Sequence, residues 1–223
     1  MNKIVNNYRE IIRQIEFYKN KFSKTSKEVN LIAVSKNFPK QDIQILIDEG
    51  HTIFGENKVQ EATSKWPQLK LNSREIKLHL LGPLQTNKIK PALKIFDVIE
   101  TLDREKLAKK IKKYFDAEKE TSKHKFFVQV NIGNEDQKSG VEVNYTKEFV
   151  KWCINDLNLN VNGLMCIPPI YGKAEVYFKE LKRLCNDSNL EHASMGMTGD
   201  YGEAIRCGAT FVRIGTGIFG GRD

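Results

Sequence analysis

The sequence of 223 residues has few of the features that mark membrane, secreted or metal-binding proteins. No apolar run is long enough to span a bilayer, and the N-terminus has no apolar segment followed by a small-residue cleavage site. The four cysteines are widely spaced, with no CxxC pair and no cluster with histidine, which argues against a zinc site or a disulfide framework. We therefore expect a cytoplasmic protein that does not act in a membrane and whose thiols are buried and reduced.

Positive charge is in excess, but it is not arranged as in nucleic-acid-binding proteins. The chain has 36 lysines and arginines against 28 acidic residues, a net charge of +8. Such an excess can indicate a nucleic-acid partner. In apparently helical segments such as 104–113, however, the lysines are scattered among acids and are not interleaved with aromatic residues. Solvated helix faces explain the charge, and we expect no nucleic-acid partner.

The apolar residues follow two periodicities that alternate along the chain. Residues 1–22 have apolar positions at helical spacing, which predicts a leading helix packed outside the core. Apolar runs of β type then alternate with helical stretches such as 42–49 and 175–185. The predicted strands cover residues 31–36, 52–56, 77–82, 98–102, 125–131, 161–167, 190–195 and 210–215.

Eight successive βα units in a chain of this length indicate a single closed (β/α)8 barrel, the TIM barrel fold, over residues 1–223. A doubly wound open sheet is the alternative. A barrel of this kind carries its functional residues at the C-terminal ends of the strands. The unusual polar and glycine-rich segments follow the predicted strands in this way, and they include Lys36, 55–57, 82–88, 194–198 and 215–217.

Lys36 ends the first predicted strand and is the candidate reactive residue. A lysine in this place is ordinarily a solvated strand end. At the mouth of a packed core it becomes a nucleophile, because desolvation disfavours the charged form of the amine. Residues 194–196 and 215–217 supply glycines and hydroxyls where such barrels bind phosphate through backbone N–H groups. Glycine-rich turns are common, so only the combination with Lys36 points to a ligand that has both a phosphate and an electrophilic group.

Arg213 lies within the apolar strand 210–215. A guanidinium there either points into a site or pairs with an acid on the side that faces the helices. Alternation places Arg213 and Gly215 on the same face and favours the barrel interior. An inward cation near a phosphate site and opposite Lys36 fits pyridoxal 5'-phosphate (PLP), with the lysine as Schiff base and the arginine at the ring nitrogen.

Six motifs in the same order closely resemble the pyridoxal-phosphate homeostasis protein family, which is similar in fold to the N-terminal barrel of alanine racemase. They are AVSK (33–36), GENKVQE (55–61), HLLGPLQTNK (79–88), GLMCI (163–167), SMGM (194–197) and VRIGT with IFG (212–220). The resemblance covers nearly the whole chain. It implies a protein of intracellular vitamin B6 homeostasis that holds PLP covalently and either stores it or delivers it to apo-enzymes.

The resemblance also assigns the cofactor-binding residues. These are Lys36, Asn57, Met165, Ser194, Arg213, Gly215 and Thr216. Lys36 carries the Schiff base, and Arg213 faces the pyridine nitrogen, where its charge disfavours protonation and weakens the ring as an electron sink. Ser194, Gly215 and Thr216 bind the phosphate and the other two line the cofactor, while His79 lies on the same rim with an open role. Thr198, where the family has serine, and Gly217, where alanine is frequent, are conservative departures.

Two enzymatic alternatives stay open. One is a PLP-dependent racemase or decarboxylase of the alanine racemase type. The other is a phosphate-sugar barrel enzyme that uses Lys36 for a substrate Schiff base and has no cofactor. Alanine racemases add a β-rich domain that supplies a tyrosine base and a subunit interface, whereas this sequence ends just after the eighth predicted strand. We therefore expect a monomeric binding protein without robust turnover.

Overall fold

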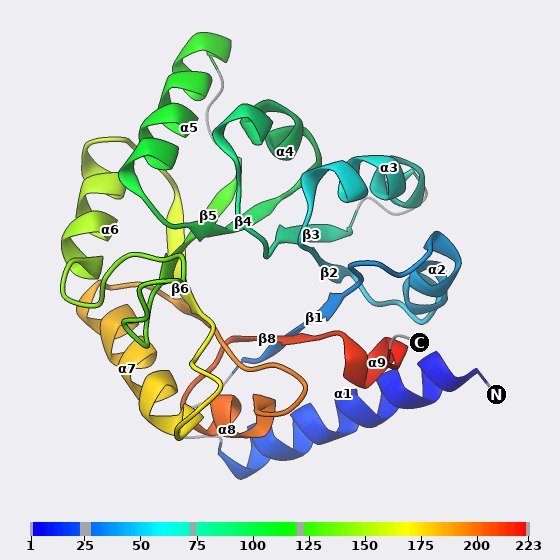
Figure 1. Ribbon diagram of the computed structural model, residues 1–223. Coiled ribbons are helices and arrows are strands. Elements are labelled where there is room, and N and C mark those ends of the chain that lie inside the picture. The colour runs from blue at the N-terminus through cyan, green and yellow to red at the C-terminus, as the bar shows by residue number, and fades with distance from the viewer. Residues whose placement is uncertain (1, 23–27, 72–74, 120–122, 222–223) are drawn as a thin grey trace.

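The fold is a closed barrel of eight parallel strands (Figure 1). The computed structural model describes residues 2–22, 28–71, 75–119 and 123–221. Each strand pairs with the next along the chain, and the last pairs with the first, which closes the barrel. The strands are β1 (Asn30–Val34), β2 (Ile53–Glu56), β3 (Lys77–Leu80), β4 (Val98–Leu102), β5 (Lys125–Val130), β6 (Val161–Cys166), β7 (His192–Ser194) and β8 (Phe211–Ile214). The predicted (β/α)8 barrel is confirmed, and the doubly wound open sheet is wrong because the pairing of β1 with β8 leaves no edge strand.

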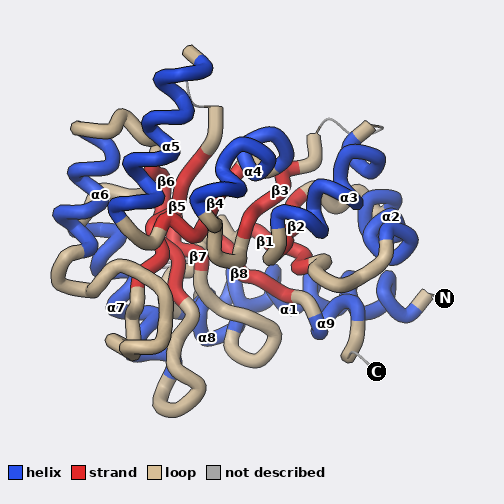
Figure 2. The backbone as a smooth tube through the Cα atoms, turned by 45° about the horizontal axis from the view of Figure 1, so that its top comes forward, coloured by secondary structure: helices blue, strands red, loops and turns tan. Residues whose placement is uncertain are grey.

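Helices surround the strands on the outside, as the two colours of Figure 2 show. Those after β1 are α2 (Lys40–Asp48), α3 (Val59–Lys70), the 3-10 turn η1 (Thr86–Lys88), α4 (Ile89–Ile95), α5 (Glu105–Glu118), α6 (Thr146–Asn155), α7 (Ala174–Asp187), α8 (Tyr201–Arg206) and α9 (Thr216–Phe219). None of the helices within the described ranges is both long and apolar enough to cross a bilayer. The helical stretches predicted at 42–49 and 175–185 correspond to α2 and α7.

The additional N-terminal helix, α1 (Lys3–Lys21), packs along α8 and α9 (Figure 1). Ile11 and Ile15 are its buried residues, and the side chain of Asn7 donates a hydrogen bond to the carbonyl of Ile218 at 3.0 Å. This is the leading helix predicted for residues 1–22, of which Met1 lies outside the described residues. The N-terminal helix is thus packed against the last two helices of the chain.

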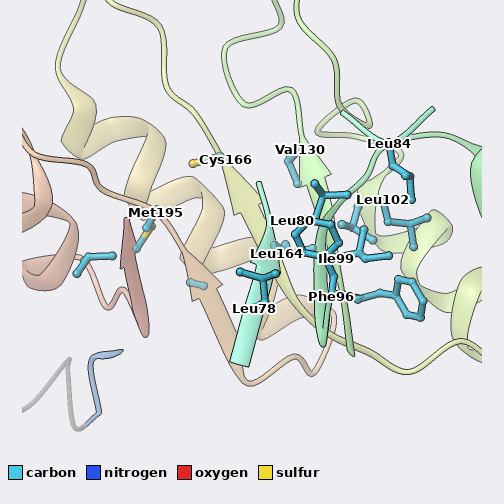
Figure 3. Packing of buried hydrophobic residues seen from close by; sticks show 14 of the residues in the cluster. Leu78, Leu80, Leu84, Phe96, Ile99, Leu102, Val130, Leu164, Cys166 and Met195 are labelled. Atoms are coloured by element: carbon cyan, nitrogen blue, oxygen red, sulfur yellow. The ribbon is translucent and has the colours of Figure 1, made fainter. Parts of the chain in front are cut away.

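Two apolar layers build the core. Figure 3 shows part of the outer layer, which includes Leu78 and Leu80 of β3, Ile99 of β4 and Leu164 of β6. A smaller cluster of Val98, Phe127, Met165 and Phe211 occupies the alternate positions of the strands and fills the barrel interior. Parallel strands covered by helices are buried on both faces, which explains their nearly continuous apolar sequences. The four cysteines are free and buried, as predicted.

The strand ends differ from the predictions in ways that affect the site. β1 ends at Val34, so Lys36 lies in the following turn and not within the strand. The turn arises because Asn37 has φ of 64°, a left-handed conformation that asparagine tolerates better than most residues and that ends an extended chain. β7 covers only His192–Ser194 instead of 190–195.

Candidate functional site

A cavity of about 280 Å³ opens at the rim formed by the C-terminal ends of the strands. Its volume is near the lower end of the range for small-molecule pockets, about 300 to 1,000 Å³. This rim is where barrels of this class place their active sites. The cavity is lined by Val34, Lys36, Asn57, Leu81, Ile167, Met197, Thr198, Gly199, Arg213, Gly215 and Thr216.

Five of the seven predicted cofactor residues line this one cavity, namely Lys36, Asn57, Arg213, Gly215 and Thr216. Lys36 follows β1 and Arg213 lies on β8, and these strands are paired in the sheet, so two cations from sequence-distant segments face the same space. Among the described residues that line the cavity there is no carboxylate. The lining is therefore suited to an anionic ligand.

The inward direction of Arg213 follows the two-residue repeat of β8. Arg213 and Gly215 both line the cavity, whereas Val212 and Ile214 are fully buried in the outer core. This is the arrangement that alternation predicts for a strand whose two faces contact different layers. The helix-facing, acid-paired alternative for Arg213 does not apply.

A continuous chain of hydrogen bonds holds Arg213 from below. Its guanidinium donates to the carbonyl of Cys166 at 2.7 Å and to the hydroxyl of Ser194 at 2.8 Å. The Ser194 hydroxyl in turn donates to Glu100 at 2.6 Å, and the other oxygen of Glu100 lies 2.7 Å from Nδ1 of His79. All of these side chains are buried. The charge of Arg213 is thus linked to a buried carboxylate through one serine.

Three predicted rim residues lie outside the cavity lining. Ser194 is fully buried, with its hydroxyl engaged by Arg213 on one side and Glu100 on the other. Met165 is 1% exposed and belongs to the interior cluster, two residues before Ile167, which does line the cavity. His79 is 2% exposed. Inward-facing positions of a barrel stack in layers, and these residues belong to layers below the cavity.

Thr198 is a lining residue that the sequence analysis treated only as a conservative departure. Its hydroxyl oxygen accepts hydrogen bonds from the backbone N–H of Gly217 at 3.3 Å and from the hydroxyl of Thr216 at 3.2 Å. A Cβ added to Gly217 would lie 3.0 Å from the Thr198 side chain, and one added to Gly215 would lie 3.2 Å from the Val34 carbonyl. The loop after β7 and the turn after β8 therefore form a close-packed wall of hydroxyls and glycine backbone.

The thiol of Cys166, whose carbonyl accepts from Arg213, is not a nucleophile of this site. Burial raises its pKa to about 12, and the nearby Arg213 guanidinium acts weakly in the opposite direction. The thiol is therefore protonated at neutral pH, and it is the thiolate that attacks electrophiles. Lys36 is the candidate nucleophile among the described residues that line the cavity.

Known proteins resemble this chain in sequence and in fold. The chain matches the family model described as alanine racemase, N-terminal domain, over residues 8–223. It is 36% identical over 230 residues to the pyridoxal phosphate homeostasis protein of Pasteurella multocida, covering 99% of this chain and 98% of that one. A crystal structure of an unknown protein from Bifidobacterium adolescentis has a TM-score of 0.88 and 28% identity, covering 97% and 94% of the two chains. PipY of Synechococcus elongatus, solved with PLP bound, has a TM-score of 0.76 and 29% identity, covering 93% and 100%.

Proposed function

The chain belongs to the pyridoxal phosphate homeostasis protein family, and from this premise we propose that it binds PLP in the cavity between Lys36 and Arg213. One observation carries the proposal: a lysine, an arginine and a wall of hydroxyls and glycines, from opposite ends of the chain, line a single cavity that has no carboxylate among its described lining residues. PLP supplies an aldehyde that condenses with a lysine amine and a ring that can accept electrons.

We assign different residues of the cavity to different parts of the cofactor. We assign Lys36 to the covalent bond with the aldehyde carbon, formed with loss of water. We assign Thr216 and Gly215 to the phosphate. We add Thr198, because it lines the same cavity and its hydroxyl accepts from the Thr216 hydroxyl and from the Gly217 N–H. Asn57 forms the neighbouring part of the wall.

Arg213 is assigned to the pyridine nitrogen. A guanidinium is always charged and offers only donors, so it disfavours a proton on the ring nitrogen. Ser194 then contributes from below by linking Arg213 to Glu100, and Met165 supports the cavity floor through the interior cluster. A ring without that proton stabilises carbanions poorly, so the arrangement favours holding the cofactor over turning over amino acids.

The biological role that we propose is PLP homeostasis, with the protein storing the cofactor or delivering it to apo-enzymes. Relatives that match over nearly the full chain carry the name of homeostasis proteins. A cytoplasmic location is part of the proposal, supported by four buried free thiols, which are typical of reducing compartments. We also propose that the protein acts as a monomer, which sedimentation of the loaded protein tests.

Covalent labelling tests the binding site. The protein is incubated with PLP, reduced with borohydride, and digested for mass spectrometry. The label is expected on Lys36, and Lys36→Ala is expected to lose it while retaining its far-UV circular dichroism, because the side chain lines a cavity and is not part of the core. Lys58→Ala is the matched control, since Lys58 is an exposed rim lysine outside this cavity. A label that persists in Lys36→Ala at wild-type yield contradicts the proposal.

Two further experiments address the role. Loaded protein is mixed with an apo-enzyme in the presence of a trap for free aldehyde, and recovery of enzyme activity supports delivery over storage. Incubation with a panel of L-amino acids, followed by chiral analysis of the products, tests the racemase or decarboxylase alternative. Sustained turnover there contradicts a pure binding role.

A further inference from the structure

A second lysine, Lys65 of α3, is buried directly behind the turn that carries Lys36. Its side chain is 9% exposed, and its ammonium lies 2.8 Å from carboxylate oxygens of both Glu56 and Glu61. Burying an ammonium is costly unless charged and polar partners compensate for the lost water. A lysine with this many partners therefore requires an explanation beyond the packing of one helix.

The remaining contacts of Lys65 are with the Lys36 turn itself. Its ammonium donates to the carbonyl of Ser35 at 3.1 Å and to the carbonyl of Phe38 at 3.3 Å. These two carbonyls lie on either side of Lys36 in the sequence. One buried cation thus bridges the turn from its first residue to its last.

The carboxylates that neutralise Lys65 hold the same turn. Glu61 accepts a hydrogen bond from the backbone N–H of Asn37 at 2.5 Å, and Glu56 accepts one from the hydroxyl of Ser35 at 2.7 Å. Asn37 is the residue with positive φ, so the turn has one defined conformation. Both residues next to Lys36 are therefore held by the ionic network around the buried Lys65, and the Lys36 side chain lines the cavity.

We propose that Lys65 is a positioning residue, whose buried ammonium fixes the turn after β1 so that the amine of Lys36 is held at the reacting position in the cavity. The inference rests on the proposed function, in which Lys36 bonds the cofactor. Burial raises the pKa of Glu56, and Lys65 opposes that change. Loss of Lys65 therefore also removes the positive charge that compensates the burial of Glu56, the acceptor for the Ser35 hydroxyl.

Lys70 offers a matched control on the same helix. Its ammonium donates to the carbonyl of Ile95 at 3.1 Å and to Asp97 at 2.7 Å, so it too joins a carbonyl and a carboxylate. Those partners come after α3 in the chain, just before β4, whereas the Lys36 turn comes before α3. Lys70→Met and Lys65→Met thus remove the same kind of group, and only the second touches the turn.

The experiment compares full-length wild type, Lys65→Met, Lys65→Arg and Lys70→Met with two ligands. PLP can bond Lys36, whereas pyridoxamine 5'-phosphate has an amine in place of the aldehyde and cannot. Lys65→Met is expected to weaken PLP binding about tenfold or more and to slow borohydride-trapped labelling of Lys36 by a similar factor, because small misplacements of a reacting group are costly. Its affinity for pyridoxamine 5'-phosphate is expected to stay within about twofold, because the phosphate wall is untouched. Lys65→Arg, which keeps the charge, is expected to recover part of the labelling rate, and Lys70→Met to match wild type with both ligands.

Several outcomes overturn the inference. Wild-type labelling by Lys65→Met, or an equal loss of affinity for both ligands, shows that Lys65 does not act through Lys36. If Lys65→Met does not fold, Glu61→Gln makes the same test, because Glu61 is partly exposed and contacts both Lys65 and Asn37. Unchanged labelling in that variant also overturns the inference. Absence of labelling in wild type itself contradicts the proposed function, so the two failures are distinguishable.

Discussion

The guanidinium of Arg213 donates a hydrogen bond to the hydroxyl of Ser194 at 2.8 Å, and that hydroxyl donates one to Glu100 at 2.6 Å. One serine therefore acts as acceptor for a buried cation and donor to a buried anion. The arrangement compensates the burial of both charges without direct contact between them. It also fixes the position of the Arg213 guanidinium at the cavity, because the Cys166 carbonyl accepts a second hydrogen bond from it.

Removal of this serine hydroxyl is expected to destabilise the protein. Ser194→Ala leaves Arg213 and Glu100 each one hydrogen bond short in a buried setting, which costs about 2 kcal/mol. Ser188→Ala is the matched control, because the Ser188 hydroxyl is buried with no hydrogen-bond partner among the described residues, and its removal is expected to be neutral. Urea denaturation of both variants measures the difference. Equal free energies of unfolding in the two variants would show that the Arg213 link has no energetic weight.

Gly82 is required by a close backbone approach between the loops after β2 and β3. A Cβ at this position would lie 2.1 Å from the carbonyl oxygen of Asn57, a cavity residue. Gly82→Ala is expected to push the two loops apart, to cost about 2 kcal/mol in stability and to weaken PLP binding. Gly199→Ala provides the comparison, because a Cβ there meets no atom within 4 Å. Calorimetric unfolding is expected to show a loss only for the first variant.

His51 makes stability depend on pH. Burial lowers its pKa to about 4, from an ordinary value of 6.5, while its Nε2–H donates to the Ile53 carbonyl at 2.8 Å. The unfolded chain therefore takes up a proton between these pH values before the folded protein does. The contribution of His51 to the free energy of unfolding is fully present above about pH 6.5. It is lost as the pH falls toward 4, a change of about 3 kcal/mol. The free energies of unfolding of wild type and His51→Gln at pH 7.5 and 4.5 check this. If His51→Gln keeps the pH dependence of wild type, another group than His51 causes it.

The barrel could be predicted from sequence because its determinants are local. Eight β-type apolar runs alternate with helical ones, and this alternation indicates parallel strands joined by helices. It favours the closed barrel at eight units, but only the pairing of β1 with β8 excludes the open sheet. The end of β1 was harder to predict. The sequence carries no glycine or proline directly after Val34, and the turn depends on the left-handed conformation of Asn37. Strand boundaries thus depend on single backbone conformations that composition does not reveal.

The site was predictable where a residue's type conflicts with its surroundings. Arg213 in an apolar strand was such a case, and it lines the cavity. The burial of Ser194 and Met165 below the cavity could not be predicted from the sequence, because the tilt of the strands decides which layer of inward positions reaches the rim. Lys65 gave no signal either, since a buried lysine and a solvated one on a helix have the same sequence pattern. The motifs predict the candidate residues, and the packing decides which of these residues line the cavity.

The hydroxyl of Thr198 provides the most direct test of the phosphate wall. Thr198→Val keeps the shape of the side chain but removes the acceptor for Thr216 and for the Gly217 N–H, together with a donor to the cavity. We expect about a tenfold loss of affinity for PLP, the effect of one lost hydrogen bond to a charged group, and no loss for pyridoxal, which has no phosphate. Thr63→Val serves as control, since the Thr63 hydroxyl bonds only its own helix at the Val59 carbonyl. Fluorescence titration with PLP and with pyridoxal measures both affinities for wild type, Thr198→Val and Thr63→Val. An equal loss of affinity for PLP and pyridoxal in Thr198→Val would place the phosphate elsewhere on the rim. Removal of a phosphate contact cannot lower the affinity for a ligand that has no phosphate.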